Sequence, residues 1–196
     1  MKDFWNDRYA DAQFAYGTEP NTFFAEQINT LTPGKLLLPA EGEGRNAVYA
    51  ASLGWEVHAF DYSKQGQQKA LALAQKNGVD IHYHIMDFAT FQCDDNYDAI
   101  GLIYAHMPSE LRKNVHHKLA ASLNPNGRII LEAFHKNQLG RKSGGPKNED
   151  MLYTKSDLKN DFASLNIDYL EKEKVYLDEG NFHYGEAVVV RGVFSN

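Results

Sequence analysis

The chain has 196 residues, 43% hydrophobic and 12% aromatic, which is enough apolar material for one domain with its own core. No apolar run approaches the roughly 20 residues of a membrane span, and the polar start of the chain lacks the apolar stretch of a signal peptide. The net charge of −6 disfavours a nucleic-acid-binding protein, and a single cysteine, Cys93, excludes an internal disulfide and a thiolate metal cluster. We therefore expect a cytoplasmic protein with neither a nucleic-acid nor a membrane partner.

Two short helices are predicted first, at residues 3–9 and 22–31. Short apolar runs then alternate with helical stretches, a pattern typical of a parallel sheet with crossover helices. Ser63 supplies a helix N-cap, and Asn77 with Gly78 supplies an end. A turn is predicted at residues 124–127, Asn-Pro-Asn-Gly. The predicted strands are 35–39, 56–60, 81–86, 97–104 and 128–134, and the predicted helices between them are 45–53, 63–76 and 109–123.

The C-terminal third departs from this alternation. Residues 139–150 are rich in Gly, Lys and Pro and are predicted to form a mobile loop, whose basic side chains we expect in solvent. A helix at 154–165 follows. The last two strands, 168–177 and 186–194, are joined by so short a connection that they must be antiparallel. We therefore predict a single α/β domain over residues 1–196, with a doubly wound seven-stranded sheet of five parallel strands plus a C-terminal antiparallel hairpin at 166–196. Residues 1–31 would form a helical lid.

A glycine-rich loop follows the first strand, in the stretch LLLPAEGEGRNAVYAA at residues 36–51. Gly42 and Gly44 stand between a strand and a helix, which is the context of a nucleotide-binding loop. Asp61 ends the second strand, where a carboxylate can accept both hydroxyls of an adenosine ribose. At the end of the third strand, Asp87 could accept from the adenine amino group, although a helix-capping or loop acid is the alternative.

The charge of the loop distinguishes between ligands. Glu41 and Glu43 flank the position of a dinucleotide pyrophosphate, and each carboxylate–phosphate pair at about 6 Å costs on the order of 3 kcal/mol at an effective dielectric near 20. S-adenosylmethionine (SAM) carries a sulfonium, an ammonium and one carboxylate, but no phosphate. The two glutamates therefore favour SAM over NAD.

These motifs together resemble the class I SAM-dependent methyltransferases, whose fold is Rossmann-like. The loop resembles their first motif, FDYS matches the ribose-binding acid, MDF the adenine segment, and YDAIGLIYAHMP the fourth strand. GEGRN, FWNDRY and EGNFHYGEA are similar to small bacterial methyltransferases of the tellurite-resistance and thiopurine-methyltransferase type. The resemblance implies SAM as the cofactor, S-adenosylhomocysteine as the product, and a cofactor-binding set of Tyr16, Gly17, Ala40, Glu41, Gly42, Glu43, Gly44, Asn46, Asp61, Tyr62, Ser63, Asp87, Phe88 and Tyr104.

The sequence departs from that family at two positions of the first motif. Leu38 stands where the family often has an acid, and Glu41 stands where it often has a cysteine. The acid in the first strand helps to hold the methionine ammonium, so Glu41 could supply that charge here.

Two histidines are candidate catalytic residues. His106 follows the fourth strand, and the resemblance brings His183, in the hairpin turn, near the methyl acceptor; each could instead be a structural or surface residue. Methyl transfer needs alignment more than proton transfer, so a soft acceptor such as a thiol or a reduced chalcogen would need little base help. Glu132 and His135 could line the acceptor pocket or support the edge of the core.

Other features keep alternatives open. His82 and His84 have the spacing of metal ligands on one strand face, but no third ligand is evident, so no metal is expected. Phe4, Trp5 and Tyr9 could form an aromatic lid or simply pack on the sheet. The leading hypothesis is methylation of a small-molecule acceptor. The alternatives are an NAD-binding oxidoreductase and a non-catalytic SAM-binding regulator, and the acceptor and the oligomeric state stay open.

Overall fold

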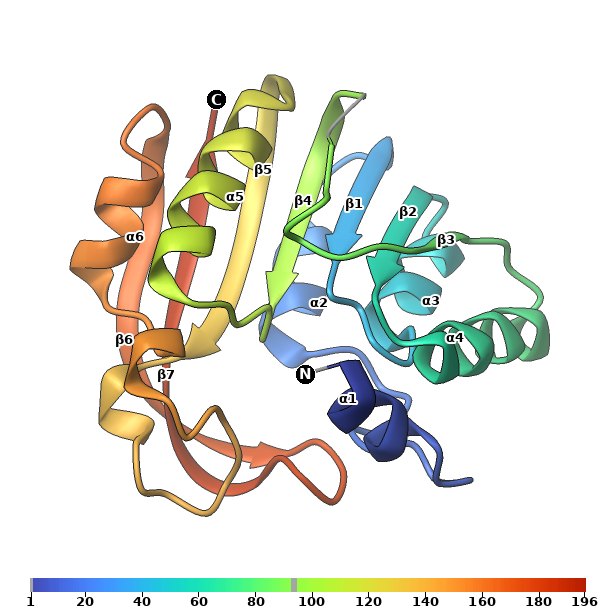
Figure 1. Ribbon diagram of the computed structural model, residues 1–196. Helices are drawn as coiled ribbons and strands as arrows, with labels where there is room; N and C mark the ends of the chain where they lie inside the picture. Colours follow the sequence, from blue (N-terminus) through green and yellow to red (C-terminus); the bar gives the residue numbers. More distant parts are fainter. Residues whose placement is uncertain (1, 93–94) are drawn as a thin grey trace.

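A computed structural model describes residues 2–92 and 95–196, so Cys93 lies outside the described residues. One seven-stranded sheet runs through it in the order β3-β2-β1-β4-β5-β7-β6 (Figure 1). The first five strands pair in parallel, and β7 pairs antiparallel with both β5 and β6. This confirms the predicted fold class. The strands are β1 Lys35–Pro39, β2 Glu56–Asp61, β3 His82–Ile85, β4 Tyr97–Ile103, β5 Leu123–Phe134, β6 Asn166–Asp178 and β7 Tyr184–Ser195.

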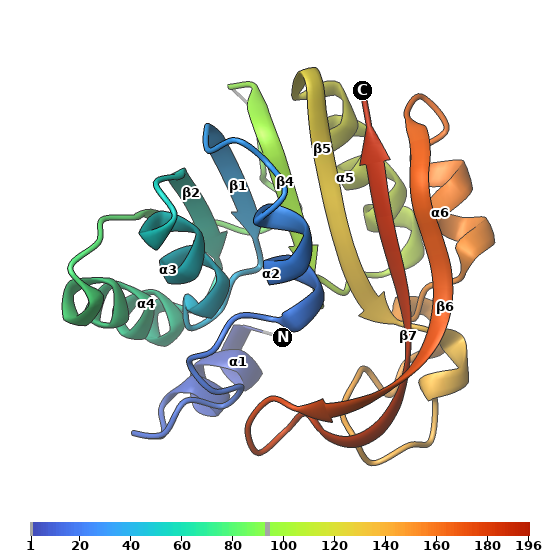
Figure 2. The same cartoon turned by 180° about the vertical axis from the view of Figure 1, so that it is seen from behind.

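Helices cover both faces of the sheet. α2, α3 and α4 pack on one face, and α5 and α6 on the other (Figures 1 and 2). α1 lies beyond the carboxyl ends of β1 and β2, apart from these two layers. No helix in the described part of the chain is long and apolar enough to cross a membrane. The helices are α1 Lys2–Tyr9, α2 Thr22–Ile28, α3 Arg45–Ser52, α4 Lys64–Asn77, α5 Ser109–Ala121 and α6 Lys155–Asp161, with 3₁₀ turns η1 Lys136–Gln138 and η2 Glu149–Met151.

Side-chain caps fix where several helices begin. The Ser63 side chain accepts from the Gly66 N–H at the start of α4, and Gly78 ends that helix with φ of 67°. Thr154 and Asp157 form a reciprocal capping box at α6. These local signals explain why the predicted boundaries of α4 and α6 lie close to the observed ones at their N-termini.

The predicted turn at residues 124–127 is wrong. β5 already begins at Leu123, which pairs with Tyr97, and the pairing resumes at Arg128 opposite Ala99. The extra residues on β5 are accommodated as a bulge in which Asn126 has φ of 66°. The turn residues therefore bend a strand instead of preceding it, and α5 ends at Ala121 because Leu123 is already paired.

The C-terminal hairpin extends past the sheet. β6 and β7 curve beyond the carboxyl end of β5, and their connection lies near α1 (Figures 1 and 2). The segment between β5 and α6 descends to the same edge. Three segments that are distant in sequence thus meet at the carboxyl ends of the parallel strands, where ligands bind in open α/β sheets.

Candidate functional site

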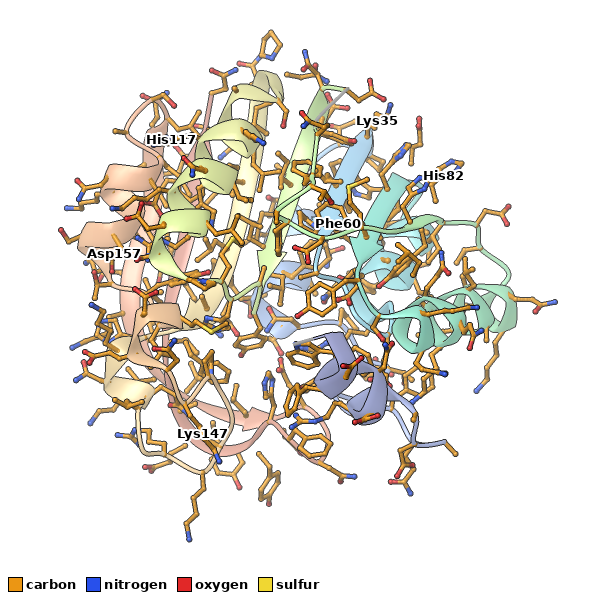
Figure 3. All side chains as sticks on the ribbon, viewed as in Figure 1. Lys35, Phe60, His82, His117, Lys147 and Asp157 are labelled. Carbon is orange, nitrogen blue, oxygen red and sulfur yellow. The ribbon has the colours of Figure 1, made fainter. Side chains whose placement is uncertain are left out.

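A cavity of about 770 Å³ lies at this edge of the sheet. We call one side the β1–β2 wall; it contains the last residue of β2 and residues that follow β1, β2 and β3, namely Ala40, Glu41, Asp61, Tyr62, Asp87 and Phe88. We call the other side the hairpin wall; it contains residues that follow β4, the last residue of β5 and the tip of the hairpin, namely Tyr104, His106, Phe134, Asn181, Phe182 and His183. Figure 3 labels Lys147 at this edge, on the segment between β5 and α6.

The loop glycines serve packing. Gly42 has φ of 63°, and a Cβ there would lie 2.6 Å from the Tyr9 hydroxyl of α1. Gly44 has φ of 88°, and a Cβ would lie 2.5 Å from the Cβ of Ala70 in α4. Neither glycine lines the cavity, and Ser63, buried as the cap of α4, does not line it either. These three members of the predicted cofactor-binding set shape the wall from behind it.

Glu41 occupies the N-terminus of α3. Its Oε1 accepts from the backbone N–H groups of Asn46 and Ala47, each at 2.8 Å. Burial raises the pKa of Glu41 to about 7, although these hydrogen bonds and the nearby Arg45 lower it. The positive end of α3, which would otherwise receive a phosphate, therefore already holds a carboxylate.

Glu43 has partners of its own. Its Oε1 lies 2.6 Å from Nζ of Lys69 in α4, and its Oε2 accepts from the Ala15 N–H at 2.8 Å. Glu43 lines the cavity, but its charge is matched by Lys69 and its position holds the N-terminal segment to α4. The two loop glutamates thus differ: within residues 2–92 and 95–196, Glu43 has an ion-pair partner and Glu41 has none.

Asp61 ends β2 and points toward the loop. Its Oδ1 accepts from the Ser63 N–H at 2.8 Å, and its Oδ2 lies 3.3 Å from the Gly42 N. Burial raises its pKa to about 6, while hydrogen bonds from the backbone of Ser63, Gly42 and Tyr62 lower it. Three backbone donors orient the carboxylate at the wall without supplying a counter-charge.

The segment after β3 forms the outer part of this wall. Asp87 caps a turn by accepting from the Ala89 N–H at 2.9 Å, so the alternative of a loop-capping acid describes its contacts. Phe88 is buried against Phe60, with ring centroids 5.4 Å apart. Both residues also line the cavity.

A buried ion-pair network supports the hairpin wall. Glu179 accepts from Arg45 at 3.1 Å, from His183 Nδ1 at 3.2 Å and from Asn21 at 3.0 Å. Burial raises the pKa of Glu179, but the hydrogen bond from His183 and the charge of Arg45 outweigh it and lower the value to about 2. An ionised carboxylate can only accept, so Nδ1 of His183 carries the proton.

His183 is enclosed by aromatic rings. The centroids of Tyr16, Tyr104 and Phe134 lie 4.4, 4.5 and 5.1 Å from that of the imidazole. Burial lowers the pKa of His183, although Glu179 raises it. With Nδ1 held by Glu179, Nε2 is the unprotonated nitrogen of the ring, and the His183 side chain lines the cavity. A neutral, oriented imidazole of this kind can act as a base.

His106 lines the same cavity in a different state. The Phe134 N–H can only donate, and it points to Nε2 of His106 at 3.2 Å; Nδ1 therefore carries the proton and donates to the Met151 carbonyl at 2.7 Å. Burial lowers the pKa of His106 to about 4. Both ring nitrogens are occupied by backbone groups, so His106 is positioned as a brace between β5 and the loop before α6.

The N-terminal segment and the hairpin tip meet above the cavity. Trp5 stacks on Tyr9 with ring centroids 5.4 Å apart, and both line the cavity. The Arg8 guanidinium lies 3.8 Å from the Phe182 ring centroid and donates to the Tyr16 hydroxyl at 3.0 Å. α1 therefore contacts the hairpin instead of only packing on the sheet.

The basic segment between β5 and α6 faces the cavity in part. Lys142 and Lys147 are exposed, as expected for a solvated loop, and they also line the cavity. The loop therefore contributes two solvated cations to the hairpin side of the cavity. Ser143 anchors it by donating to the Glu186 carbonyl at 2.6 Å.

Glu132 and His135 support the wall without lining the cavity. Glu132 is fully buried and accepts from Tyr104, Asn21 and Arg191. His135 accepts from the Asn137 N–H and caps η1. The alternative of structural support at the edge of the core fits both residues.

Sequence reasoning missed the partners of His183. Arg45 directly follows the glycine loop, and Glu179 lies four residues before His183. Arg45 and Glu179 are 134 positions apart in the sequence. The spacing of Glu179 and His183 within one hairpin turn was the available signal. The contribution of Arg45 depends on the hairpin reaching the loop after β1, which only the tertiary structure shows.

Comparisons with known proteins agree with this architecture. Residues 39–127 match the sequence model of a family described as a methyltransferase domain. The matched stretch begins at the last residue of β1 and ends within β5, so it contains the loop, Asp61 and His106. No curated protein matches the chain.

Several solved structures share the fold. TehB from Haemophilus influenzae superposes with a TM-score of 0.76 at 14% identity, over 100% of this chain and 66% of that one, so this chain spans just under two thirds of TehB. A solved structure whose description is the conversion of a disulfide bond into a thioacetal group during echinomycin biosynthesis gives a TM-score of 0.81 at 14% identity. The superposition covers 100% of this chain and 91% of that one. The N-methyltransferase NodS from Bradyrhizobium japonicum, in complex with S-adenosylhomocysteine, gives 0.71 at 11% identity, covering 100% and 97%.

Proposed function

We propose that this chain is a SAM-dependent methyltransferase that acts on a small-molecule acceptor. The observation that carries the proposal is the pair of buried acids on the β1–β2 wall, Glu41 and Asp61, which have backbone donors but no ion-pair partner in the part of the chain that the structure describes. SAM is the cofactor, and S-adenosylhomocysteine is the product. The methyltransferase match at residues 39–127 and the complex of NodS with S-adenosylhomocysteine support this choice.

The residues of the β1–β2 wall suit a cationic nucleoside. Asp61 would accept the ribose hydroxyls, and the backbone after Asp87, with the ring of Phe88, would hold the adenine. Glu41 would face the positive methionine end, close to Ala40 and Gly17. A dinucleotide is disfavoured because Glu41 already occupies the helix N-terminus that a pyrophosphate would need.

His183 is the proposed catalytic base, and its tautomer determines the direction of proton transfer. Nδ1–H stays bound to Glu179, so the proton of an acceptor X–H moves to the free Nε2. SAM supplies, when bound, a methyl group on positively charged sulfur that is already activated for transfer. The resulting imidazolium is stabilised by the Glu179 carboxylate, and His106, with both nitrogens occupied, has no part in this proton transfer.

The proposed acceptor carries an acidic, soft nucleophile such as a thiol or a reduced chalcogen species. Lys142 and Lys147 line its side of the cavity and attract an anion, while Met107, Met151 and Phe134 offer polarisable, apolar surface. The sulfur chemistry in the description of the echinomycin structure is consistent with this class. A non-catalytic SAM-binding regulator would have no use for an oriented base, so the pair of Glu179 and His183 favours an enzyme.

Two measurements test the proposal. SAM at about 100 times its dissociation constant should stabilise the protein by roughly 2.7 kcal/mol, or roughly 5–10 °C in melting temperature for a chain of this size, and NAD should give little. Conversion of SAM to S-adenosylhomocysteine should then depend on an acceptor, in a panel of thiols, reduced selenium and tellurium species, phenols and amines. A melting shift with NAD and none with SAM would contradict the proposal.

A further inference from the structure

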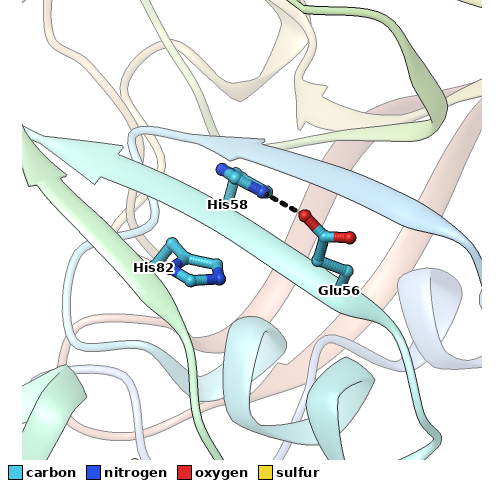
Figure 4. Close-up of side chains that lie close together, drawn as sticks. All are labelled: Glu56, His58 and His82. Atoms are coloured by element: carbon cyan, nitrogen blue, oxygen red, sulfur yellow. Dashed lines mark hydrogen bonds and ion pairs between the residues drawn. The ribbon is translucent and has the colours of Figure 1, made fainter.

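A second cluster of ligating side chains lies on the face of β2 and β3, outside the cavity. β2 and β3 pair in parallel with His58 opposite His82, and Glu56 lies two residues before His58 on the same strand face. Figure 4 shows the three side chains together. None of them lines the cavity, and His58 stands three residues before Asp61, about 10 Å along the strand.

The geometry already resembles a chelating arrangement. His58 Nε2 lies 2.9 Å from Glu56 Oε1, and the His58 and His82 rings stack with centroids 4.8 Å apart. One ligand atom from each residue lies within 4.8 Å of the others. Tetrahedral coordination with bonds of about 2.0–2.1 Å needs ligand atoms about 3.4 Å apart. The Glu56 side chain is 57% exposed, so it can make this adjustment without disturbing the core.

The surrounding charges permit a cation. Lys35 Nζ lies 3.9 Å from Glu56 Oε1, but Lys35 also binds Asp95, so one ammonium faces two carboxylates. With neutral imidazoles, the group of Glu56, Lys35 and Asp95 has a net charge of −1. The sequence alone places His82 beside His84 on one strand face without a third ligand; the structure instead brings His82 next to His58 across the strands and adds Glu56.

We propose that Glu56, His58 and His82 form a binding site for a late first-row divalent metal ion, with Zn²⁺ as the representative. Two imidazoles and one carboxylate suit Zn²⁺, Cu²⁺ or Ni²⁺, whereas Mg²⁺ and Ca²⁺ prefer oxygen ligands alone. β3 is an edge strand of four residues that pairs only with β2 in the described sheet. The ion therefore ties the edge of the sheet to its interior.

Titration of the metal-stripped full-length protein with Zn²⁺, followed by calorimetry, tests the site. We expect one equivalent to bind, and Mg²⁺ to give no heat. Outer-sphere changes alone cost about 10–100-fold in metal affinity, so His58→Ala and His82→Ala should each weaken Zn²⁺ binding by about tenfold or more. Glu56→Gln should also weaken binding.

His84→Ala is the matched control, because His84 is exposed on the same strand but lies opposite Phe60. It should bind Zn²⁺ as the parent does. SAM affinity should be unchanged in all four variants, which separates this site from the cavity and serves as a check of folding. No Zn²⁺ binding by the parent, or an equal loss in His84→Ala and His82→Ala, would overturn the proposal.

Discussion

On the β1–β2 wall, burial raises the pKa of Glu41 to about 7 and that of Asp61 to about 6, whereas on the hairpin wall the pKa of Glu179 is lowered to about 2. All three carboxyl groups are largely buried. The difference lies in their partners: Glu179 receives hydrogen bonds from Arg45 and His183, while Glu41 and Asp61 receive backbone N–H groups alone or with an amide.

This contrast separates a ligand-binding wall from a preorganised one. A buried acid with a raised pKa has lost water without gaining a cation, so a cationic ligand or one rich in hydroxyl groups stabilises it. A buried acid with a lowered pKa is already satisfied and can hold another group in place. The β1–β2 wall therefore gains most from a bound cofactor, and the hairpin wall is complete before an acceptor arrives.

The largest effect should come from removing the base of the hairpin wall. His183→Ala should lower turnover by about 10²–10⁴-fold, near the low end for a thiol or chalcogenide acceptor, because proton transfer to Nε2 is lost. SAM affinity should stay within about threefold, since Glu179 and not the cofactor holds His183. Steady-state kinetics and SAM binding measure both quantities.

His106→Gln is the matched control on the same wall. A glutamine amide can donate to the Met151 carbonyl and accept from the Phe134 N–H, as His106 does. Turnover should therefore remain within about tenfold of the parent. Equal losses in the two variants would show that the tautomers do not decide which histidine is the base.

The next effect concerns pH and the cofactor. A cationic ligand favours the ionised forms of Glu41 and Asp61, so SAM binding should release protons, and affinity should fall as pH drops below the free-protein values of about 7 and about 6. Between pH 8 and pH 5 we expect a loss of up to about 1000-fold, roughly 100-fold from Glu41 and 10-fold from Asp61, which calorimetry in two buffers can resolve. A flat profile over this range would contradict the assigned charge state of the β1–β2 wall.

The sequence predicts those parts of the two walls whose contacts are between residues close in sequence. The strand Lys35–Pro39 and Asp61 at the end of β2 follow from local patterns, and the structure places them as expected, whereas the loop glycines lie behind the cavity wall. The role of Glu43 could not be predicted, because its partner Lys69 lies in α4, 26 residues further along the sequence.

The hairpin wall is harder to predict because its contacts are distant in sequence. Arg45 and Glu179 meet because the hairpin curves beyond the carboxyl end of β5 and reaches the loop after β1. Lys142 and Lys147 line the cavity because the segment between β5 and α6 folds over the hairpin wall. Asn-Pro-Asn-Gly at residues 124–127 illustrates the opposite error. Its local sequence favours a turn, but Leu123 before it and Arg128 after it both pair with β4, so the segment forms a bulge within β5.

Asp61 gives the third prediction, of intermediate size. Asp61→Ala should weaken SAM binding by about 1.5–3 kcal/mol, the range for a hydrogen bond to a charged group, or roughly ten- to a hundredfold. The protein should stay folded, because the hydrogen bonds that the carboxylate accepts within the described residues come from backbone N–H groups after β1 and β2. Unchanged SAM affinity together with a large fall in melting temperature would make Asp61 a structural residue.

The smallest predicted effect is on the stability of the unliganded protein. Replacing the buried acid by glutamine should raise stability on the β1–β2 wall and lower it on the hairpin wall. The pKa of Glu41 is raised from 4.5 to about 7, so its contribution favours folding fully below pH 4.5 and is lost as pH rises through 7. At pH 8 this costs the unliganded protein up to about 3 kcal/mol, at 1.36 kcal/mol per pH unit. Glu41→Gln should remove most of that cost.

Glu41→Gln should stabilise the unliganded protein by about 1–2 kcal/mol at pH 8, or roughly 2–8 °C in melting temperature. This is less than the full cost because the amide NH₂ of the glutamine would face the Asn46 side chain, which donates to Glu41 in the parent. Glu179→Gln is the matched variant of opposite sign. The pKa of Glu179 is lowered from 4.5 to about 2, so its stabilisation is present above pH 4.5 and is lost as pH falls toward 2; the variant should melt lower than the parent at pH 8. Melting curves of both unliganded variants at pH 8 and pH 4 provide the test. If the two glutamines shift the melting temperature in the same direction at pH 8, the walls do not hold their acids in opposite states, and the preorganisation of the hairpin wall would have to come from aromatic packing around His183 alone.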